Sequence, residues 1–435
     1  MKLNYKRVIL VGMAFFTIST FWQAYDSIIP LILTNHFGLP QSVSGVIMSA
    51  DNVLAVFMLP LFGALSDKVN TKFGKRTPFI FFGTIAAIIS FIALTFIDNI
   101  QLANIITAGV QGNPDPVRLA LEITTKNPLV LIGFIATLLL ALVSMATFRS
   151  PAVALMPDIT IKPLRSKANA VINLTGTAGG MLVLALGIVF ATSKNKYMSY
   201  TGYFVAVASL MLAGFIIFLL SVKENKWAQE MKEQSAEPEE QQLQSGGRLS
   251  KQKLLSLMLI LLSVALWFIG HNSITSKYSV YATNILGFDF NATLIISQAS
   301  AIISYIPIGI ISSKIGRKKS ILAGIFLLAT AFISGYFITP DTPEFIMYPI
   351  FMTAGIGWAT ISVNSYPMVV GLAKEGNIGK YTGYYYTASM SAQIIAPILS
   401  GYLYDTLGMR HIFFPFGALF VALSFITMLF VRHGD

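Results

Sequence analysis

The stretch "MSADNVLAVFMLPLFGALSDKVNTKFGKRTPFI", residues 48–80, places one carboxylate inside an apolar run and a group of cations at its end. The acid is Asp51, and the cations lie between residues 68 and 76. An apolar run of about 20 residues is long enough to cross a bilayer. Lys and Arg at the end of such a run favour the cytoplasmic side. The stretch therefore predicts two membrane helices joined by a basic cytoplasmic loop.

The composition indicates a protein that crosses the membrane many times. Hydrophobic residues make up 55% of the 435 residues, charged residues make up 11%, and the mean hydropathy is +0.70. A water-soluble domain of this length would need far more charge to cover its surface. The net charge of +11 does not indicate nucleic-acid binding, because the cations fall in short clusters between apolar runs rather than in one patch.

The reactive side chains argue against an enzyme. The chain has no cysteine and four histidines. A disulfide, a thiolate nucleophile and a cysteine metal site are therefore excluded, and the histidines lack the helical pairing of a zinc site. No combination of nucleophile and base stands out. We expect no metal, no cofactor and no enzymatic activity.

About twelve apolar runs alternate with short polar segments, and several are long enough to require tilt or breaks. Most of the 30 Lys and Arg residues fall in segments that are cytoplasmic if the N-terminus is inside. This asymmetry predicts that both termini are cytoplasmic, with the chain in the inner cell membrane. The runs are 7–33, 42–65, 77–97, 128–157, 167–192, 200–222, 253–286, 291–312, 319–339, 344–371, 379–404 and 410–432.

Two polar segments interrupt this pattern. Residues 223–252, "KENKWAQEMKEQSAEPEEQQLQSGGRLSKQ", are mixed in charge and rich in Gln, which is typical of a flexible cytoplasmic linker. A calmodulin-binding or lipid-binding role stays open for them. The linker divides an N-terminal six-helix bundle, 1–222, from a C-terminal one, 253–435. An outer loop, 98–127, is long enough for short surface helices, and a lid role stays open.

The two halves of the chain repeat each other. "GALSDKVNTKFGKR" at 63–76 is echoed by "GIISSKIGRKK" at 309–319, and "FRSPAVALMPD" at 148–158 is echoed by "NSYPMVVGLAK" at 364–374. Repeats of this kind predict two related six-helix bundles with a central path between them.

The basic loop resembles the signature loop of the major facilitator superfamily. The pattern G-x-x-x-D-K followed by a basic turn consists here of Gly63, Asp67, Lys68, Gly74, Lys75 and Arg76. Its later copy has Ser313 in place of the acid and is a degenerate repeat. The resemblance implies an all-α major facilitator fold. We expect Asp67 to cap or pair with neighbouring helix ends and Arg76 and so to stabilise one conformation of an inner gate. The expected gating residues are Gly63, Asp67, Lys68, Arg76, Gly309 and Arg317.

The longer form "SDKVNTKFGKRTPFI" is similar to a narrower group. It resembles the sucrose/proton symporters of plants, their animal relatives and bacterial members of the glycoside–pentoside–hexuronide:cation symporters. "FRSPAVALMPD", "NSYPMVV" and "YTGYYYTASMSAQIIAPILSG" (381–401) extend the likeness over nearly the whole chain. This resemblance implies proton-coupled transport of a glycoside or disaccharide.

Two departures from the relatives bear on coupling. Melibiose-type sodium symporters carry two acids in the second helix, at positions that are Ala55 and Leu59 here, so that sodium site is absent. Plant sucrose symporters pair an arginine of the fourth helix with an earlier aspartate. Arg149 matches that arginine, but the earlier position is Leu138. If protons drive transport, another acid must carry them.

Ionisable groups inside a span are costly, about 2.5–3.5 kcal/mol near the centre, so each needs a reason. Asp51 lies near the middle of the second helix and Asp26 lies in the first. Burial favours the neutral form of a carboxyl group, which lets it load and release a proton. We expect Asp51 to be the leading proton carrier and Asp26 the second candidate. Hydrogen bonding to a neighbouring helix without titration stays open for both.

Three cations or potential cations also lie within spans. Arg149 precedes Ser-Pro and could bind substrate hydroxyls, clamp an inner gate, or extend to the interface. His271 lies near mid-depth of the seventh helix, where hydroxyl binding, proton relay and simple packing all stay open. Lys277 is expected to extend outward or to oppose Asp26.

Sugar binding needs aromatic faces for C–H surfaces and amides or hydroxyls for the OH groups. The first, seventh and tenth runs together supply both kinds of group, although core packing and lipid contact stay open for each residue. The substrate-binding candidates are Trp22, Tyr25, Asn52, Arg149, Trp267, His271, Asn272, Tyr278, Trp358, Asn364, Tyr366 and Gln393.

The sequence thus predicts a monomeric transporter that works by alternating access in the lipid bilayer. The expected substrate is a small neutral solute, a glycoside or disaccharide, moved together with protons. A uniporter or exporter of another small solute is the main alternative, since fold alone does not fix substrate. A membrane sensor is a weaker alternative, because the short linker offers no signalling domain.

Overall fold

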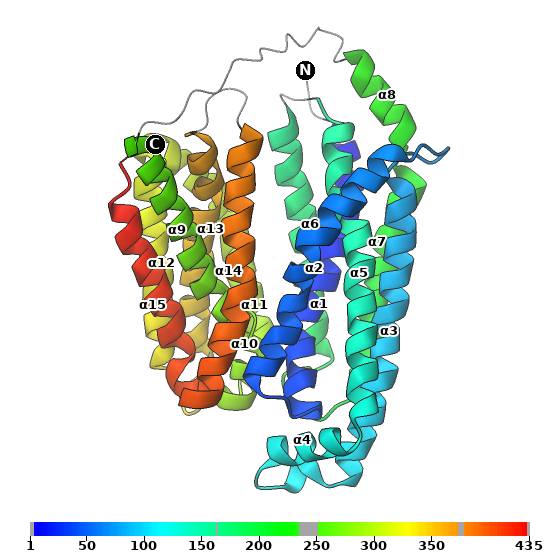
Figure 1. Ribbon diagram of the computed structural model, residues 1–435, viewed down its shortest axis with the longest axis vertical. Coiled ribbons are helices and arrows are strands. Elements are labelled where there is room, and N and C mark those ends of the chain that lie inside the picture. The colour runs from blue at the N-terminus through cyan, green and yellow to red at the C-terminus, as the bar shows by residue number, and fades with distance from the viewer. Residues whose placement is uncertain (1–3, 162–163, 235–250, 373–377, 433–435) are drawn as a thin grey trace. The chain divides into compact units, whose positions relative to one another are not determined.

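The computed structural model describes residues 4–161, 164–234, 251–372 and 378–432. All named elements in these ranges are helices, which confirms the predicted all-α class (Figure 1). Contacts between Cα atoms group the chain into two compact units. The first unit is Met1–Leu39 with Ala50–Pro238, and the second is Pro40–Ser49 with Glu239–Asp435.

The first unit holds six long helices and several short ones. Its long helices are α1 (Tyr5–Leu31), α3 (Thr77–Thr107), α5 (Pro128–Asp158), α6 (Arg165–Val189), α7 (Thr201–Ser221) and the larger part of α2 (Gln41–Lys68). The short ones are η1 (Ile32–His36), η2 (Val110–Gly112), α4 (Pro116–Lys126) and α8 (Glu224–Gln234). Within this unit α4 lies at one end of α3 and α5, and α8 lies at the other end (Figure 1).

The second unit also holds six long helices, together with the first residues of α2. They are α9 (Lys251–Thr275), α11 (Phe290–Ile315), α12 (Arg317–Tyr336), α13 (Met347–Val370), α14 (Ile378–Leu407) and α15 (Met409–Leu429). The short elements are α10 (Tyr278–Val280), η4 (Tyr281–Leu286) and η5 (Glu344–Ile346). The predicted seventh run, 253–286, is therefore broken after Thr275.

Eleven helices in the described ranges are long and apolar enough to cross a membrane, and α14 is not one of them. Many of their apolar side chains face outward. Phe57 is 69% exposed and Leu220 is 79% exposed, which would be unfavourable in water. Exposed apolar side chains of this kind are suited to contact with lipid, which agrees with the apolar composition.

Glycines let the helices approach closely within each unit. In the first unit α3 packs against α5, and a Cβ atom on Gly83 would lie 2.8 Å from Phe148 N. In the second unit α12 packs against α13, and a Cβ on Gly324 would lie 2.9 Å from Gly357 O. Gly83 lies seven residues after Arg76, and Gly324 lies seven residues after Arg317, so the two glycines hold equivalent positions in the repeat. Small residues of this kind are the usual contacts between membrane helices.

The predicted linker is partly helical. Residues 224–234 form α8, whose Trp227 is 8% exposed. Residues 235–250 lie outside the described residues. The predicted outer loop contains the end of α3, which runs to Thr107, and the surface helix α4. The sequence underestimated α3 because Asp98 and Gln101 interrupt its apolar pattern.

Each unit contains a π-helical turn followed by a glycine. In η1 and η4 the sequences are "TNHFG" (34–38) and "TNILG" (283–287). Gly38 has φ +65° and Gly287 has φ +75°, a conformation that favours glycine. A Cβ on Gly38 would also lie 2.4 Å from Val117 O of α4. Wider turns of this kind recur at functional positions.

Candidate functional site

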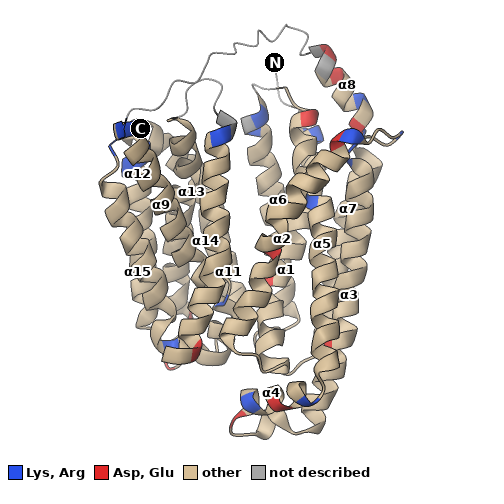
Figure 2. Cartoon of the chain, viewed as in Figure 1, with Lys and Arg blue, Asp and Glu red and all other residues tan. Residues whose placement is uncertain are grey.

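Charged side chains are sparse along the helices and gather at their ends (Figure 2). Asp51 of α2 is an exception within a span, and its carboxylate Oδ1 accepts a hydrogen bond from Asn52 Nδ2 at 2.7 Å. Asp51 interacts electrostatically with Arg149 of α5 and with Asp26 of α1. The residue Asp26 is exposed, whereas Asp51 and Asn52 are half-buried. The first unit thus brings two acids and one arginine into a single electrostatic group.

The aromatic residues of α1 lie beside this group. The guanidinium carbon of Arg149 lies 5.8 Å from the ring centroid of Trp22, within the range of a cation–π contact. Trp22 meets Tyr25 edge to face, with ring centroids 5.4 Å apart. Tyr25 is fully buried, and Trp22 is half-buried. Trp22 therefore offers part of its ring as a surface, whereas Tyr25 packs in the interior.

An aromatic stack forms the corresponding surface in the second unit. His271 of α9 stacks on Trp358 of α13 with ring centroids 3.7 Å apart and planes 13° apart. Phe268 meets the same indole edge to face at 5.3 Å. Asn272 donates from Nδ2 to Phe268 O at 2.7 Å. The residues His271, Asn272 and Trp358 are all half-buried, so the stack and the amide are partly open.

Three of the expected binding residues are buried in the second unit. Trp267 and Tyr278 are 0% exposed, and Asn364 is 2% exposed. The phenol oxygen of Tyr278 accepts from Thr293 Oγ1 at 2.8 Å. Asn364 donates from Nδ2 to Ser312 Oγ at 2.9 Å. In this structure these side chains pack the bundle, and a ligand would reach them only after a rearrangement.

Two further candidates lie on α13 and α14 with part of their surface open. Tyr366 shares a hydrogen bond of 3.0 Å between its OH and Thr382 Oγ1. Gln393 donates from Nε2 to Ser389 O at 3.3 Å. Both side chains are half-buried. They supply the hydroxyl and amide chemistry that a polyhydroxylated ligand requires.

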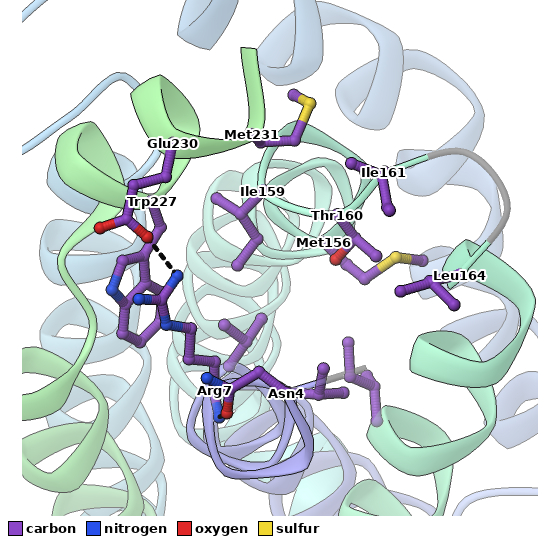
Figure 3. Close-up of a pocket in the computed structure, with 13 residues that line it drawn as sticks. Asn4, Arg7, Met156, Ile159, Thr160, Ile161, Leu164, Trp227, Glu230 and Met231 are labelled. Carbon is purple, nitrogen blue, oxygen red and sulfur yellow. Dashed lines mark hydrogen bonds and ion pairs between the residues drawn. The ribbon is translucent and has the colours of Figure 1, made fainter. Parts of the chain in front are cut away.

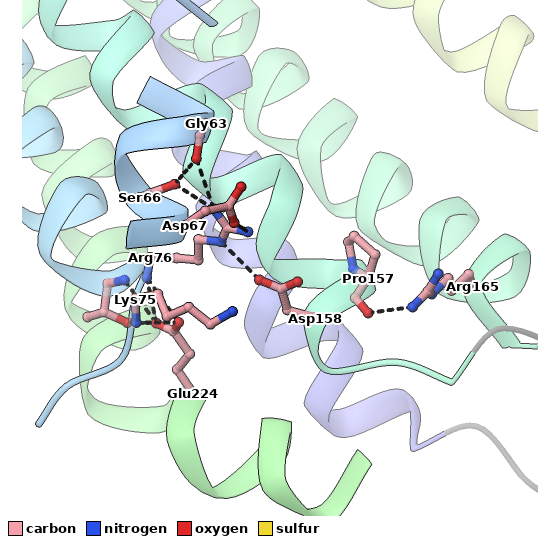
Figure 4. A network of polar contacts seen from close by, with 10 residues as sticks. Gly63, Ser66, Asp67, Lys75, Arg76, Pro157, Asp158, Arg165 and Glu224 are labelled. Carbon is pink, nitrogen blue, oxygen red and sulfur yellow. Dashed lines mark hydrogen bonds and ion pairs between the residues drawn. The ribbon is translucent and has the colours of Figure 1, made fainter. Parts of the chain in front are cut away.

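The signature loop forms a dense polar network at the end of the first unit that carries α8 (Figure 4). Arg76 is 4% exposed. Its guanidinium pairs with Asp67, which confirms the expected partner, and with Asp158 Oδ2 at 2.9 Å. It also donates to Ser66 Oγ and, at 3.4 Å, to Gly63 O. One arginine thus connects α2 with the end of α5.

The backbone beside Arg76 is held by Glu224 of α8. Its carboxylate accepts from Lys75 N at 2.7 Å, from Arg76 N at 2.9 Å and from Thr77 N at 2.9 Å. These groups lie at the start of α3, where backbone N–H groups have no helical partner. A Cβ on Gly74 would collide with this carboxylate, so the loop requires glycine there. Glu224 is 3% exposed.

The second copy of the loop is simpler. Arg317 donates from Nη1 to Pro367 O at 3.2 Å, which connects α12 to α13. A Cβ on Gly309 would meet open space, so close packing does not explain this glycine. Lys68 of the first copy is exposed. Asp158 and Glu224 were not predicted as functional, although Asp158 ends the repeated stretch 148–158.

A cavity of about 580 Å³ opens beside α8 in the first unit (Figure 3). Arg7 pairs with Glu230 at its wall and lies 5.1 Å from the ring centroid of Trp227. None of the sequence-predicted binding residues lines this cavity. The remaining lining residues are Asn4, Val8, Val11, Met156, Ile159, Thr160, Ile161, Leu164, Ile172 and Met231.

A buried polar cluster lies at the opposite end of the first unit, near α4. His36 Nδ1 is 2.6 Å from Asp98 Oδ1, and both side chains are at most 1% exposed. The other ring nitrogen, Nε2, lies 3.2 Å from Lys196 O. Tyr200 stacks on the imidazole at 5.7 Å. Burial, with Asp98 nearby, raises the pKa of the Tyr200 phenol, so this hydroxyl stays neutral.

The side chains described above can bind polar solutes and can exchange protons. No group of three or more His, Cys, Asp or Glu side chains in the described part of the chain could hold a metal ion. The electrostatic group in the first unit can hold a proton or contact a polar solute. The stack of His271 on Trp358 in the second unit can contact the flat face of a ligand ring.

Comparisons with known proteins agree with this architecture. The family model described as "Major Facilitator Superfamily" matches residues 11–397. The inward-open xylose transporter XylE from E. coli has a TM-score of 0.67 at 14% sequence identity, covering 99% of this chain and 97% of that chain. A D-xylose-proton symporter has a TM-score of 0.65 at 15% identity, covering 100% and 99%. At these identities the likeness shows the fold alone.

A shorter match exists to a curated protein. The alpha-ketoglutarate permease of Escherichia coli (strain K12) is 39% identical over 92 residues. This match covers 21% of the chain and 18% of the permease, so the chain spans under a fifth of the length of that relative.

Proposed function

The chain belongs to the Major Facilitator Superfamily and is a membrane transporter, and from this premise we propose that it moves a neutral glycoside or disaccharide together with protons. In this proposal the transporter alternates between states that open to opposite sides of the membrane. It belongs to the sucrose/proton symporter-like branch of the glycoside–pentoside–hexuronide:cation symporters. It acts as a monomer in the inner cell membrane, with both termini cytoplasmic.

The observation that carries the proposal is the electrostatic group formed by Asp26, Asp51 and Arg149 within the first unit. Charged side chains persist within a span only where a partner or a function compensates their cost. Asn52 Nδ2 donates to one oxygen of Asp51 at 2.7 Å, which holds the carboxylate in position. Asp51 is the proposed proton carrier, and Asp26 is the second candidate.

Aromatic and amide groups support the choice of a sugar. The half-buried stack of His271 on Trp358 provides a flat surface for the C–H face of a pyranose. Asn272, Tyr366 and Gln393 provide hydrogen-bonding groups beside partly open surface. The names of two similar structures, a xylose transporter and a D-xylose-proton symporter, agree with a sugar and with protons. We propose these five residues as the substrate-binding residues of the second unit, and Trp22 and Arg149 as those of the first unit.

An organic anion is the alternative substrate class. The partial likeness to alpha-ketoglutarate permease and the presence of Arg149 favour it. Against it, the same group contains Asp26 and Asp51, so an ionised site would carry one net negative charge. Like charges within a low-dielectric site repel strongly. A neutral solute fits this group better than a dicarboxylate does.

The network around Arg76 is the proposed inner gate. Its partners come from α2, α5 and α8, and a network shared by several helices can change when the helices move. Asp67 is 61% exposed at its side chain, so it is the partner that can most readily leave. Gly63, Lys68, Gly309 and Arg317 complete the proposed gate.

Uptake by proteoliposomes tests the substrate class and the coupling together. We expect accumulation of at least one radiolabelled neutral sugar, from a panel of glycosides and disaccharides that contains sucrose and maltose, when the outside is made acidic. Labelled alpha-ketoglutarate is the competing probe. Accumulation of alpha-ketoglutarate without any sugar would contradict the proposed substrate class. Equal sugar uptake with and without the proton gradient would contradict symport.

A further inference from the structure

The start of α2 is capped by an acid from α14. Asp405 Oδ1 accepts from Gln41 N at 2.7 Å, and Oδ2 accepts from Ser42 N at 2.8 Å and from Ser42 Oγ at 2.6 Å. The first N–H groups of a helix lack partners within the helix. A carboxylate at this end also interacts favourably with the helix dipole. One side chain thus satisfies both backbone donors at the start of α2.

A lysine makes a second polar contact with the same segment. Lys277, at the break between α9 and α10, donates from Nζ to Ser44 Oγ at 2.7 Å. Both side chains are 0% exposed. Asp405 and Lys277 also attract each other electrostatically. Two ionisable residues of the second unit, Asp405 and Lys277, therefore contact α2 within one turn of each other.

The backbones at this contact are nearly touching. A Cβ on Gly45 would lie 2.1 Å from Pro397 O, and a Cβ on Gly401 would lie 2.3 Å from Gln41 O. Pro397, Gly401 and Asp405 recur at every fourth position of α14, so they share one face of that helix. Such an approach admits only glycine at both positions and leaves no room for side chains between the helices.

This contact explains how α2 is divided. Residues 40–49 group with the second unit, whereas the rest of α2 groups with the first. The contacts with Asp405, Lys277, Pro397 and Gly401 all fall within this segment, at residues 41–45. Since Asp405 is itself exposed, its oxygens and the freed N–H groups can be hydrated when they separate. The contact therefore requires these residues at these positions, and it can open because water can replace its hydrogen bonds.

We propose that Asp405 is a positioning residue for transport, a clamp that docks residues 41–45 onto α14 in one state of the cycle and releases them in another. The proposal rests on the proposed function, because it assumes that the transporter changes state. Lys277 strengthens the clamp through Ser44. Asp405 contacts no substrate in this role. It acts through the position of α2, the helix that carries Asp51.

The absence of cysteine allows a clean reporter of the clamp. Ser49 is 3% exposed and lies at the end of the docked segment, so Ser49→Cys should react slowly with a water-soluble maleimide while the clamp is closed. In lipid nanodiscs both faces are accessible, so the measurement does not depend on orientation. Asp405→Asn keeps the shape but presents an amide to backbone donors. We expect labelling about tenfold faster, the effect of losing one charge-assisted hydrogen bond.

Three further variants separate loss of the clamp from misfolding. Asp405→Glu keeps the charge and should restore labelling to within about twofold of the parent, whereas Ser42→Ala, which removes one contact, should give an intermediate rate. Asp341→Asn removes an exposed acid elsewhere in the same unit and should leave the rate unchanged. Parental labelling in Asp405→Asn, or equal acceleration by Asn and Glu, would overturn the proposal.

The same preparations distinguish this proposal from the proposed function. Faster labelling of Asp405→Asn, rescued by Glu, supports the clamp even if no tested sugar is taken up, in which case the substrate proposal alone fails. Proton-driven sugar uptake by the parent together with parental labelling in Asp405→Asn overturns the clamp alone.

Discussion

Arg149 lies over the indole ring of Trp22, with its guanidinium carbon 5.8 Å from the ring centroid. The contact joins α5 to α1 and keeps the arginine beside Asp51, with which it interacts electrostatically. The sequence left three roles open for Arg149: binding substrate hydroxyls, clamping an inner gate, and extending to the interface. Its position beside Trp22 and Asp51, the proposed binding and coupling residues, favours the first role. An arginine that extended to the interface would leave this ring.

Replacing Arg149 by Lys tests the geometry of this contact. Lysine keeps the charge but cannot stack a planar group on Trp22. A cation–π contact at a desolvated position contributes about 2 kcal/mol, so we expect sugar affinity to fall by about tenfold or more. Equilibrium binding of the transported sugar to purified protein measures it. Arg118→Lys, which alters a 76%-exposed arginine side chain on α4, is the matched control and should bind normally.

Trp358 should be more sensitive than Trp267 in binding assays. Trp358 is half-buried and stacked on His271, whereas Trp267 is fully buried. We expect Trp358→Phe to weaken sugar binding by several-fold, because the smaller ring loses part of the aromatic face, which is worth about 1 kcal/mol, with little change in thermal stability. Trp267→Phe should show the opposite pattern, because it removes packing volume from the core. Equal effects of the two substitutions on affinity would contradict the proposed ligand surface.

Glu224 should stabilise the first unit more than its neighbour Glu230 does. Glu224 is 3% exposed and accepts from three successive backbone N–H groups. Glu224→Ala leaves these donors without their partner, which costs about 1–3 kcal/mol. We expect a lower melting temperature in detergent for Glu224→Ala.

Glu230→Ala is the control on the same helix. Glu230 forms a partly exposed pair with Arg7, and such pairs contribute about 0–1 kcal/mol. A melting temperature that falls equally in both variants would show that α8 docking as a whole, rather than the cap on α3, sets the stability.

The pair of His36 and Asp98 should behave as a coupled unit. Both side chains are buried and 2.6 Å apart, so removing either leaves the other without its partner in a low-dielectric site. We expect His36→Leu and Asp98→Leu each to destabilise the protein by about 3–5 kcal/mol. The double variant should lose clearly less than the sum of the two, because neither partner is then stranded. Additive changes in melting behaviour would contradict a direct coupling.

The sequence predicted the features that depend on local pattern. Hydropathy and the positions of Lys and Arg indicate the spans, and the pairing of Asp67 with Arg76 joins residues 9 positions apart in one recognised motif. Glu224 lies 148 positions from Arg76, in a segment whose Gln-rich composition indicated a linker. Nothing in its neighbourhood distinguishes a buried capping carboxylate from a solvated one.

The sequence also could not predict which face of each helix is buried. Trp267, Tyr278 and Asn364 have the residue types of a sugar site, but they face the interior. Nearly every position in these spans is apolar, so periodicity gives little indication of which face meets the bundle. The π-helical turn that brings His36 to Asp98 changes the helical register. For this reason, counting residues along a regular α-helix would place His36 on the wrong face.

Gradient-driven uptake by Asp51→Asn is the most direct test of the account. Asparagine resembles the protonated acid in shape but cannot titrate. We expect the variant to bind the sugar and to exchange labelled for unlabelled sugar, but to lose accumulation when the outside is made acidic, while Asp67→Asn retains accumulation at a slower rate. If Asp51→Asn still accumulates sugar in response to the imposed proton gradient, Asp51 does not carry the proton and the coupling mechanism proposed for this transporter is wrong.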